Sequence, residues 1–308
     1  MDRFGILLKS YRPDLPYAQR FLASVEEFAQ ENIPIVIVVP DEDVAAFTSM
    51  ARGVGEVLGE SLWGDQLVDY RIHGSSPGYV NQEIIKVTFA QRGIFANYLC
   101  ADSEAVFIRP FSTTDFMADD STPFTFLTED AELRADPLYE QAYGSVRDAH
   151  MVRLRDFLGL PARPYRTTHG LAVLSSRVCN ELSTFLAEEN MTWADALELC
   201  PYEFSWYNFW LERAQSIAMH VREPIFKTIH MEHQHLELAI RGIREADLAR
   251  GYVGVVVNSG FSRQHGHLGL DEPLSHTLGR YVSERDLAKG ALERVLRRLP
   301  RVRRALRI

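Results

Sequence analysis

The apolar positions at the start of the chain alternate between a strand pattern and a helix pattern. Residues 4–11 form an apolar run whose C-terminal end turns polar, and residues 34–40 form a β-branched run bounded by prolines. Between them, residues 15–32 carry Phe21 and Val25 on one helical stripe. Continuous β-branched runs are typical of strands buried on both faces, so this order predicts a mostly parallel sheet covered by helices.

The same alternation continues along the chain. Residues 79–91 have the apolar spacing of a helix, and the strand pattern of residues 95–101 ends at Asp102-Ser103-Glu104. Further expected elements are strands at 105–111, 123–130, 168–176 and 251–260, and helices over 129–160 and through to about residue 215. The chain has no internal repeat and no linker-like stretch. We therefore expect one α/β domain over residues 1–280, with helical elaboration, and a separate tail over residues 281–308.

Composition narrows the class of protein. The 308 residues are 46% hydrophobic and 24% charged, as in a globular protein with a substantial core. Three scattered cysteines and the lack of a signal sequence or of about 20 consecutive apolar residues predict a cytoplasmic protein. The net charge of −9 argues against a nucleic-acid partner, because such binding depends on neutralising phosphates with basic residues.

The acidic tripeptide Asp102-Ser103-Glu104 carries the clearest chemistry. Residues two apart on a strand point the same way, so both carboxylates can meet one divalent cation. Mn²⁺ and Mg²⁺ prefer carboxylate and phosphate oxygens, and such an ion stabilises the charge of a departing diphosphate. The alternative is a pair of acidic residues that solvate a strand end. The carboxyl ends of parallel strands are where α/β sheets bind ligands, which favours the metal site.

The residues around this tripeptide resemble a known family. Residues 77–86 (PGYVNQEIIK), 98–104 (YLCADSE) and 109–111 (RPF) look like a bacterial glycosyltransferase-like family associated with surface-polysaccharide gene clusters. In that family a GYxxQQxxK helix precedes a DSD motif and an RPF-like exit. The resemblance implies a GT-A-type fold, a nucleotide-sugar donor and a Mn²⁺ or Mg²⁺ ion. Glu104 stands where a second Asp is commoner, and Glu83 stands where a second Gln is commoner.

The resemblance implies roles for further residues. Glu203 is the expected general base, Asp102 takes part in catalysis, and His230 is the expected third metal ligand beside Asp102 and Glu104. The residues expected to bind the donor are Lys9, Ser10, Tyr11, Gln82, Lys86, Ser103, His169 and Gly170.

Each assignment has a plainer structural alternative. Gln82 and Lys86 lie four residues apart and can form a solvated helix face. The aromatic residues after Glu203 can be a sugar platform or simply core, with Glu203 at a helix start. A lone His169 is commonly structural, and His233 and His235 are expected on a polar surface helix.

The tail has its own pattern. From Lys289 onward the sequence holds eight basic residues and one acidic residue, and leucines and valines recur at helical spacing. A basic amphipathic helix of this kind can lie on an anionic membrane surface, or it can pack on the acidic body.

These expectations combine into one function. The chain is expected to transfer a sugar from a nucleotide-sugar donor to a hydroxyl of a glycan or lipid-linked glycan, in polysaccharide synthesis on the inner face of the membrane. One alternative is a metal-dependent nucleotidyl- or phosphoryltransferase that uses the same acidic pair. Another is a glycan-binding module without catalytic activity.

Overall fold

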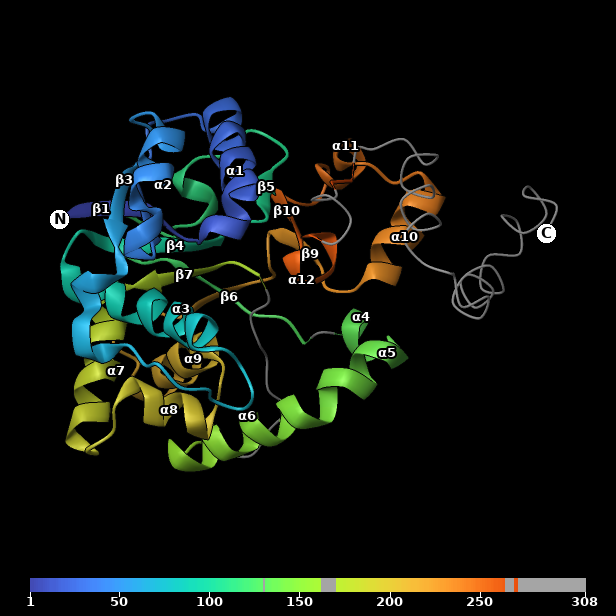
Figure 1. The fold of residues 1–308 in the computed structure, drawn as a ribbon. Helices are drawn as coiled ribbons and strands as arrows, with labels where there is room; N and C mark the ends of the chain where they lie inside the picture. The colour runs from blue at the N-terminus through green and yellow to red at the C-terminus, as the bar shows by residue number, and fades with distance from the viewer. Residues whose placement is uncertain (130, 162–169, 264–268, 271–308) are drawn as a thin grey trace.

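The computed structural model describes residues 1–129, 131–161, 170–263 and 269–270. Its main sheet has five strands in the order β3-β2-β1-β4-β7, and the first four run parallel while β7 runs antiparallel to β4 (Figure 1). The strands are β1 (Asp2–Lys9), β2 (Ile35–Val39), β3 (Glu56–Gly59), β4 (Phe95–Asp102) and β7 (Ala172–Ser175). The predicted α/β fold with a mostly parallel main sheet is therefore confirmed.

Helices cover both faces of this sheet. On β1, Ile6 and Leu8 face one core with the first two helices, whereas Leu7 faces a second core on the other side of the sheet. The helices of the first core are α1 (Leu15–Phe28) and α2 (Val44–Ala51). Those of the second core include α3 (Pro77–Thr88), α7 (Ser176–Glu188), α8 (Trp193–Leu199) and α9 (Glu203–Ala214). Burial on both faces explains the continuous apolar runs of β1 and β2.

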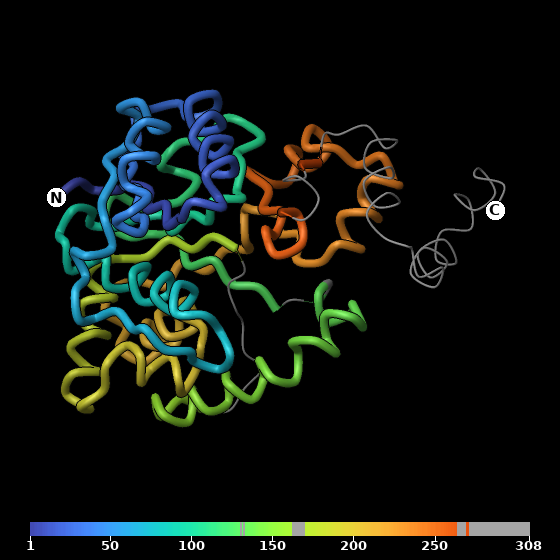
Figure 2. The backbone as a smooth tube through the Cα atoms, viewed as in Figure 1, coloured from blue at the N-terminus to red at the C-terminus, as the bar shows by residue number. Residues whose placement is uncertain are grey.

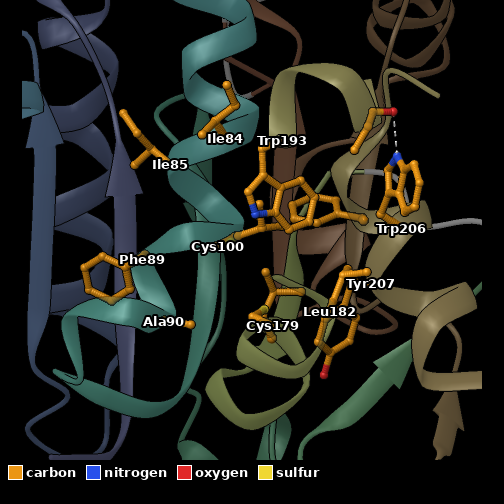
Figure 3. Close-up of a cluster of buried hydrophobic side chains, with 14 of the residues drawn as sticks. Ile84, Ile85, Phe89, Ala90, Cys100, Cys179, Leu182, Trp193, Trp206 and Tyr207 are labelled. Carbon is orange, nitrogen blue, oxygen red and sulfur yellow. Dashed lines mark hydrogen bonds between the residues drawn. The ribbon is translucent and has the colours of Figure 1, made fainter. Parts of the chain in front are cut away.

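Figure 3 shows the second core between α3, α7, α8 and α9. Trp206 and Tyr207 of α9 are fully buried there, as are Cys179 and Leu182 of α7. The aromatic segment after Glu203 is therefore mainly core, and the alternative of a sugar platform is wrong for Trp206, Tyr207 and Phe209. Its rings are surrounded by other side chains and offer no open face.

Two small sheets follow the main one. The first has the order β5-β10-β9, with β5 (Ala105–Phe107) antiparallel and β9 (Phe226–Ile229) parallel to β10 (Gly254–Val257). The second pairs β6 (Phe124–Phe126) with β8 (His220–Arg222). Strands β3, β8 and β9 were not predicted, because they are short, and because β3 and β8 carry the exposed polar residues Glu56 and His220 while β9 has Lys227 and Thr228 at its centre. Gly254 is required in β10, since a Cβ there would meet the Phe226 ring at 2.0 Å.

The remaining helices are short or lie to one side. The backbone path in Figure 2 runs from the main sheet through α4 (Ala131–Arg134), α5 (Pro137–Tyr139), a π-helical turn (Glu140–Gly144) and α6 (Ser145–Phe157). Later come α10 (Glu232–Arg241), α11 (Glu245–Leu248) and α12 (Ser259–Ser262). Short 3₁₀ segments occupy Arg12–Asp14, Asp41–Asp43, Glu60–Gln66, Phe89–Arg92 and Thr113–Asp115, and the third of these is kinked at Gly64. In the described part of the chain, no helix has the length and apolar character needed to cross a bilayer.

Candidate functional site

The predicted site residues come together at the carboxyl edge of the main sheet. Lys9 ends β1, Asp102 ends β4, and the two are paired in the sheet register. Glu60 follows β3 directly. Because β7 runs antiparallel, Gly170 enters the sheet at this same edge, with a φ of +74° that suits glycine. Four segments far apart in sequence therefore meet at one edge, as expected for a ligand site in an α/β sheet.

Lys86 lies at the centre of this edge. Its Nζ is 3.1 Å from Asp102 Oδ1 and 3.1 Å from Glu203 Oε1, and the lysine side chain is only 5% exposed. Burial alone lowers the pKa of Lys86, but the charges of Asp102 and Glu203 outweigh it, so this pKa lies well above its usual value. The ammonium therefore stays charged, and the solvated helix face considered for Lys86 is wrong.

The two carboxylates expected to act in catalysis thus share one ammonium ion. Glu203 begins α9 and its side chain is 7% exposed, whereas that of Asp102 is 23% exposed. Burial raises the pKa of Glu203, but the Lys86 charge and hydrogen bonds from Glu83 and Lys86 leave it below its usual value. Asp102 is the carboxylate of this pair that remains open to a ligand.

A second buried lysine lies beside the first. Lys9 Nζ is 2.7 Å from Glu60 Oε1 and donates a hydrogen bond to the carbonyl oxygen of Ser10 at 2.8 Å. Burial lowers the pKa of Lys9, with Glu60 opposing and Lys86 adding to the effect. Ser103 Oγ donates to Ser10 Oγ at 2.8 Å. Ser10 and Ser103, which follow β1 and β4 and are both expected to bind the nucleotide-sugar donor, are thereby joined directly.

Glu104 is held from the C-terminal part of the chain. Its Oε1 accepts a hydrogen bond from the Ser259 amide at 3.1 Å, at the start of α12. Burial, followed by the charge of Asp102, raises the pKa of Glu104 to about 7. Two carboxyl groups this close repel each other when both are ionised, and a bound cation would relieve that repulsion.

The carboxylate oxygens at this edge suit a divalent ion. Asp102 and Glu104 supply carboxylate oxygens at one edge, and Mn²⁺ or Mg²⁺ is commonly held by one or two carboxylates together with substrate phosphates. In the residues that the structure describes, no three His, Cys, Asp or Glu side chains group as ligands. The fit therefore depends on oxygens that a phosphate ligand would bring.

Tyr11 lies just after the end of β1 at this edge. Its side chain is exposed, and the Arg263 guanidinium lies 5.5 Å from the centre of its ring. Arg263 also pairs with Asp14 at 2.7 Å. A hydrogen bond between the Tyr17 and Ser262 hydroxyls adds a further contact between the first strand–helix unit and residues 259–263. The segment after β10 therefore closes over the end of β1.

Other predicted residues lie less centrally. Gln82 is half-buried on α3, and no hydrogen bond joins its side chain to another described residue. His230 follows β9, at the same end of the small sheet as Glu104, and its ring centre lies 5.7 Å from that of Tyr139. It also lines a cavity of about 720 Å³ between β9 and α10. Its role as a metal ligand stays a prediction. His169 lies outside the described residues, as does the tail from residue 281.

The expected surface helix around the other histidines is partly wrong. His233 and His235 do lie on a helix, α10, but His235 is buried and its Nε2 lies 3.1 Å from the Gly269 carbonyl oxygen. His233 Nε2 lies 2.6 Å from Asp136 Oδ2, which ties α10 to the loop before α5. Both histidines therefore have structural contacts.

Sequence reasoning missed three residues of the site. Glu60 follows an unpredicted strand, and Arg263 lies in a loop far from the motif. Glu83 was noted only as a departure from a pattern, although it is buried at 4% exposure beside Glu203. Its place three residues before Lys86 on the same helix was the one available signal.

Comparison with known proteins gives a family and a distant structural likeness. Residues 7–246 match the model described as a family of unknown function, DUF6492. No curated protein matches the chain. Among solved structures, it is similar to mouse xyloside xylosyltransferase 1 in its apo form, at 11% identity and a TM-score of 0.49, over 84% of this chain and 98% of that one. At that level the likeness assigns no activity. Since the family model spans more than half of the sequence, the chain belongs to the DUF6492 family of unknown function.

Proposed function

We propose that this protein is a glycosyltransferase that moves a sugar from a nucleotide-sugar donor to a hydroxyl of a glycan or lipid-linked glycan. The observation that supports it best is the carboxylate pair Asp102 and Glu104 where the parallel strands end, with the charged Lys86 beside Asp102. A GT-A-type arrangement, a place in surface-polysaccharide synthesis and contact of the basic tail with an anionic membrane belong to the same proposal.

In this proposal the residues of the site have separate roles in binding the ion, the donor and the acceptor. Asp102 and Glu104 hold the divalent ion, which supplies positive charge to the diphosphate as it leaves. Lys86 adds a fixed positive charge beside Asp102 and stays protonated because of the charges of Asp102 and Glu203. Tyr11 offers an exposed ring to the nucleotide base, while Ser10 and Ser103 fix the loop that carries it. Gln82 and Gly170 are proposed donor contacts, and Glu203 remains the proposed base.

Binding measurements test this proposal directly. In a thermal-shift screen of nucleoside diphosphates and nucleotide-sugars, we expect one nucleotide with Mn²⁺ to raise the Tm of the wild type. Asp102→Asn removes a ligand charge but keeps the side-chain shape, and we expect the shift to disappear. Product analysis should then show a free nucleoside diphosphate. Pyrophosphate as the product, or no shift with any nucleotide in a folded protein, would contradict the proposal.

The raised pKa of Glu104 predicts how cation binding depends on pH. A carboxyl group must lose its proton to bind Mn²⁺, and the pKa of Glu104 is raised to about 7 by burial and by Asp102. Below that pH the proton competes with the ion, so Mn²⁺ affinity should fall by up to about tenfold per pH unit. Titrations at pH 5.5, 6.5 and 7.5 check this. Glu104→Gln should bind weakly at every pH, and a wild type with no pH dependence would exclude Glu104 as a ligand.

A further inference from the structure

Three carboxyl groups gather around the single ammonium of Lys86. Asp102 and Glu203 pair with it directly, while Glu83 lies one turn earlier on α3 and pairs with no described base. Lys86, Glu83 and Glu203 are buried, and the Asp102 side chain is 23% exposed. If every carboxyl were ionised, the cluster would carry two uncompensated negative charges away from water, which is very costly.

The contact between Glu83 and Glu203 shows which carboxyl group binds a proton and so lowers this excess of negative charge. Both carboxyl groups are buried, with Glu83 4% and Glu203 5% exposed, and they lie within hydrogen-bonding reach of each other. Two ionised carboxylates have only acceptors, so such a contact requires one proton between them. Glu203 is also bonded to Lys86, and this partner favours its ionised form. The proton therefore belongs on Glu83.

The surroundings of Glu83 agree with this assignment. Burial, followed by the Glu203 charge, raises the pKa of Glu83 well above its usual range. The ionisable groups that face it are Tyr79 and Lys86 from its own helix, Tyr202 and Glu203 from the start of α9, and Asp102 from β4. The other side chains that close this space are uncharged: Ile72, Ser75, Val80, Leu197 and Pro201. Among these described groups Lys86 is the only cation, and a further one, Arg147, lies 5.1 Å from the centre of the Tyr202 ring.

We propose that Glu83 is a neutral carboxylic acid in the folded protein that donates a hydrogen bond to Glu203, and that this acid pair acts through Lys86 to position Asp102. Glu83 is then a positioning residue, because it reaches Asp102 only through Glu203 and Lys86. A protonated glutamic acid has nearly the shape of glutamine and the same ability to donate, so Gln should replace it. The location of the proton is independent of any activity, whereas the positioning of Asp102 for a donor rests on the proposed function.

The pH dependence of folding tests where the proton lies. An ordinary glutamate is ionised above about pH 4.5, so folding of the wild type must bind one proton at higher pH. Its folding equilibrium constant should therefore fall by up to about tenfold per pH unit, relative to Glu83→Gln, between about pH 5 and about pH 8. Urea denaturation at several pH values measures this ratio. Glu104 contributes to the pH dependence of folding in the wild type and in Glu83→Gln alike, so its contribution cancels in the ratio of the two folding constants.

Matched variants make the outcome decisive. Glu26→Gln changes an exposed glutamate of α1 and should leave the wild-type slope unchanged. If Glu83→Gln runs parallel to the wild type, or if Glu203→Gln removes the slope in its place, the proposal is overturned.

A binding experiment tests the positioning role. Glu83→Ala leaves Glu203 without its donor, and we expect Mn²⁺ affinity in the presence of the nucleotide found by thermal shift to fall by about 10- to 100-fold. Glu83→Gln should restore it. Equal effects of the two substitutions, or no effect of either, would overturn the positioning role. A wild type that binds neither nucleotide nor Mn²⁺ would remove this role together with the proposed function, while the folding slope still decides where the proton lies.

Discussion

Replacing Lys86 by methionine should destabilise the protein by about 3–5 kcal/mol at pH 8. Methionine has a similar length but no charge, so Asp102 and Glu203 would lose the ammonium that lies 3.1 Å from each of them. The cost comes from leaving two carboxylates in a poorly hydrated place, and it exceeds the net value of the ion pairs themselves. Urea denaturation followed by tryptophan fluorescence measures the loss.

The loss should shrink as the pH falls. Without Lys86 the carboxyl groups of the cluster can relieve their repulsion by binding protons, and protons are easier to bind at pH 5 than at pH 8. As a control, Glu181→Gln breaks the exposed pair between Arg177 and Glu181 and should cost less than about 1 kcal/mol. A Lys86→Met variant no less stable than this control would mean that Lys86 does not hold the cluster together.

The motif residues of this cluster could be predicted from the sequence, but their contacts could not. The strand that ends at Asp102 and the helix that carries Lys86 follow from apolar spacing, and both elements lie where they were expected. That these elements lie at one edge follows from the parallel order of the strands. The Lys86 contact with Glu203 joins residues 117 positions apart, and no local pattern encodes such a distance.

The parts of the site that were missed share a physical cause. Strands β3 and β9 are held by backbone pairing with a neighbouring strand, and their side chains show no strong alternation. Glu60 follows β3, and the position of Thr228 within β9 explains why Gly170 must lack a side chain. The acid pair of Glu83 and Glu203 is visible only once the burial of both side chains is known.

The aromatic segment of α9 shows how a pattern can support two interpretations. Glutamate followed by several aromatic residues fits a sugar platform with a base, and it equally fits a buried helix that begins with an acidic residue. The structure favours the second, because Trp206 is 0% exposed and its Nε1 donates to the carbonyl oxygens of Ala196 at 3.1 Å and Cys200 at 3.0 Å. Figure 3 shows a hydrogen bond at the nitrogen of this ring. The indole joins the end of α8 to the helix that carries Glu203.

Trp206→Ala should therefore cost about 3–5 kcal/mol, through a cavity and the loss of one hydrogen bond at each of two carbonyl groups, which keep their backbone donors. Trp206→Phe keeps most of the volume and should lose about 1–3 kcal/mol, which isolates the hydrogen bonds. Trp210→Ala is the matched control, since Trp210 lies one turn later, is partly exposed, and has an indole nitrogen with no hydrogen bond in the described residues. Because the same helix carries Glu203, the Ala variant should also weaken the pH dependence assigned to Glu83. A Trp206→Ala protein as stable as the Trp210 control would show that the α8–α9 contact does not fix the site.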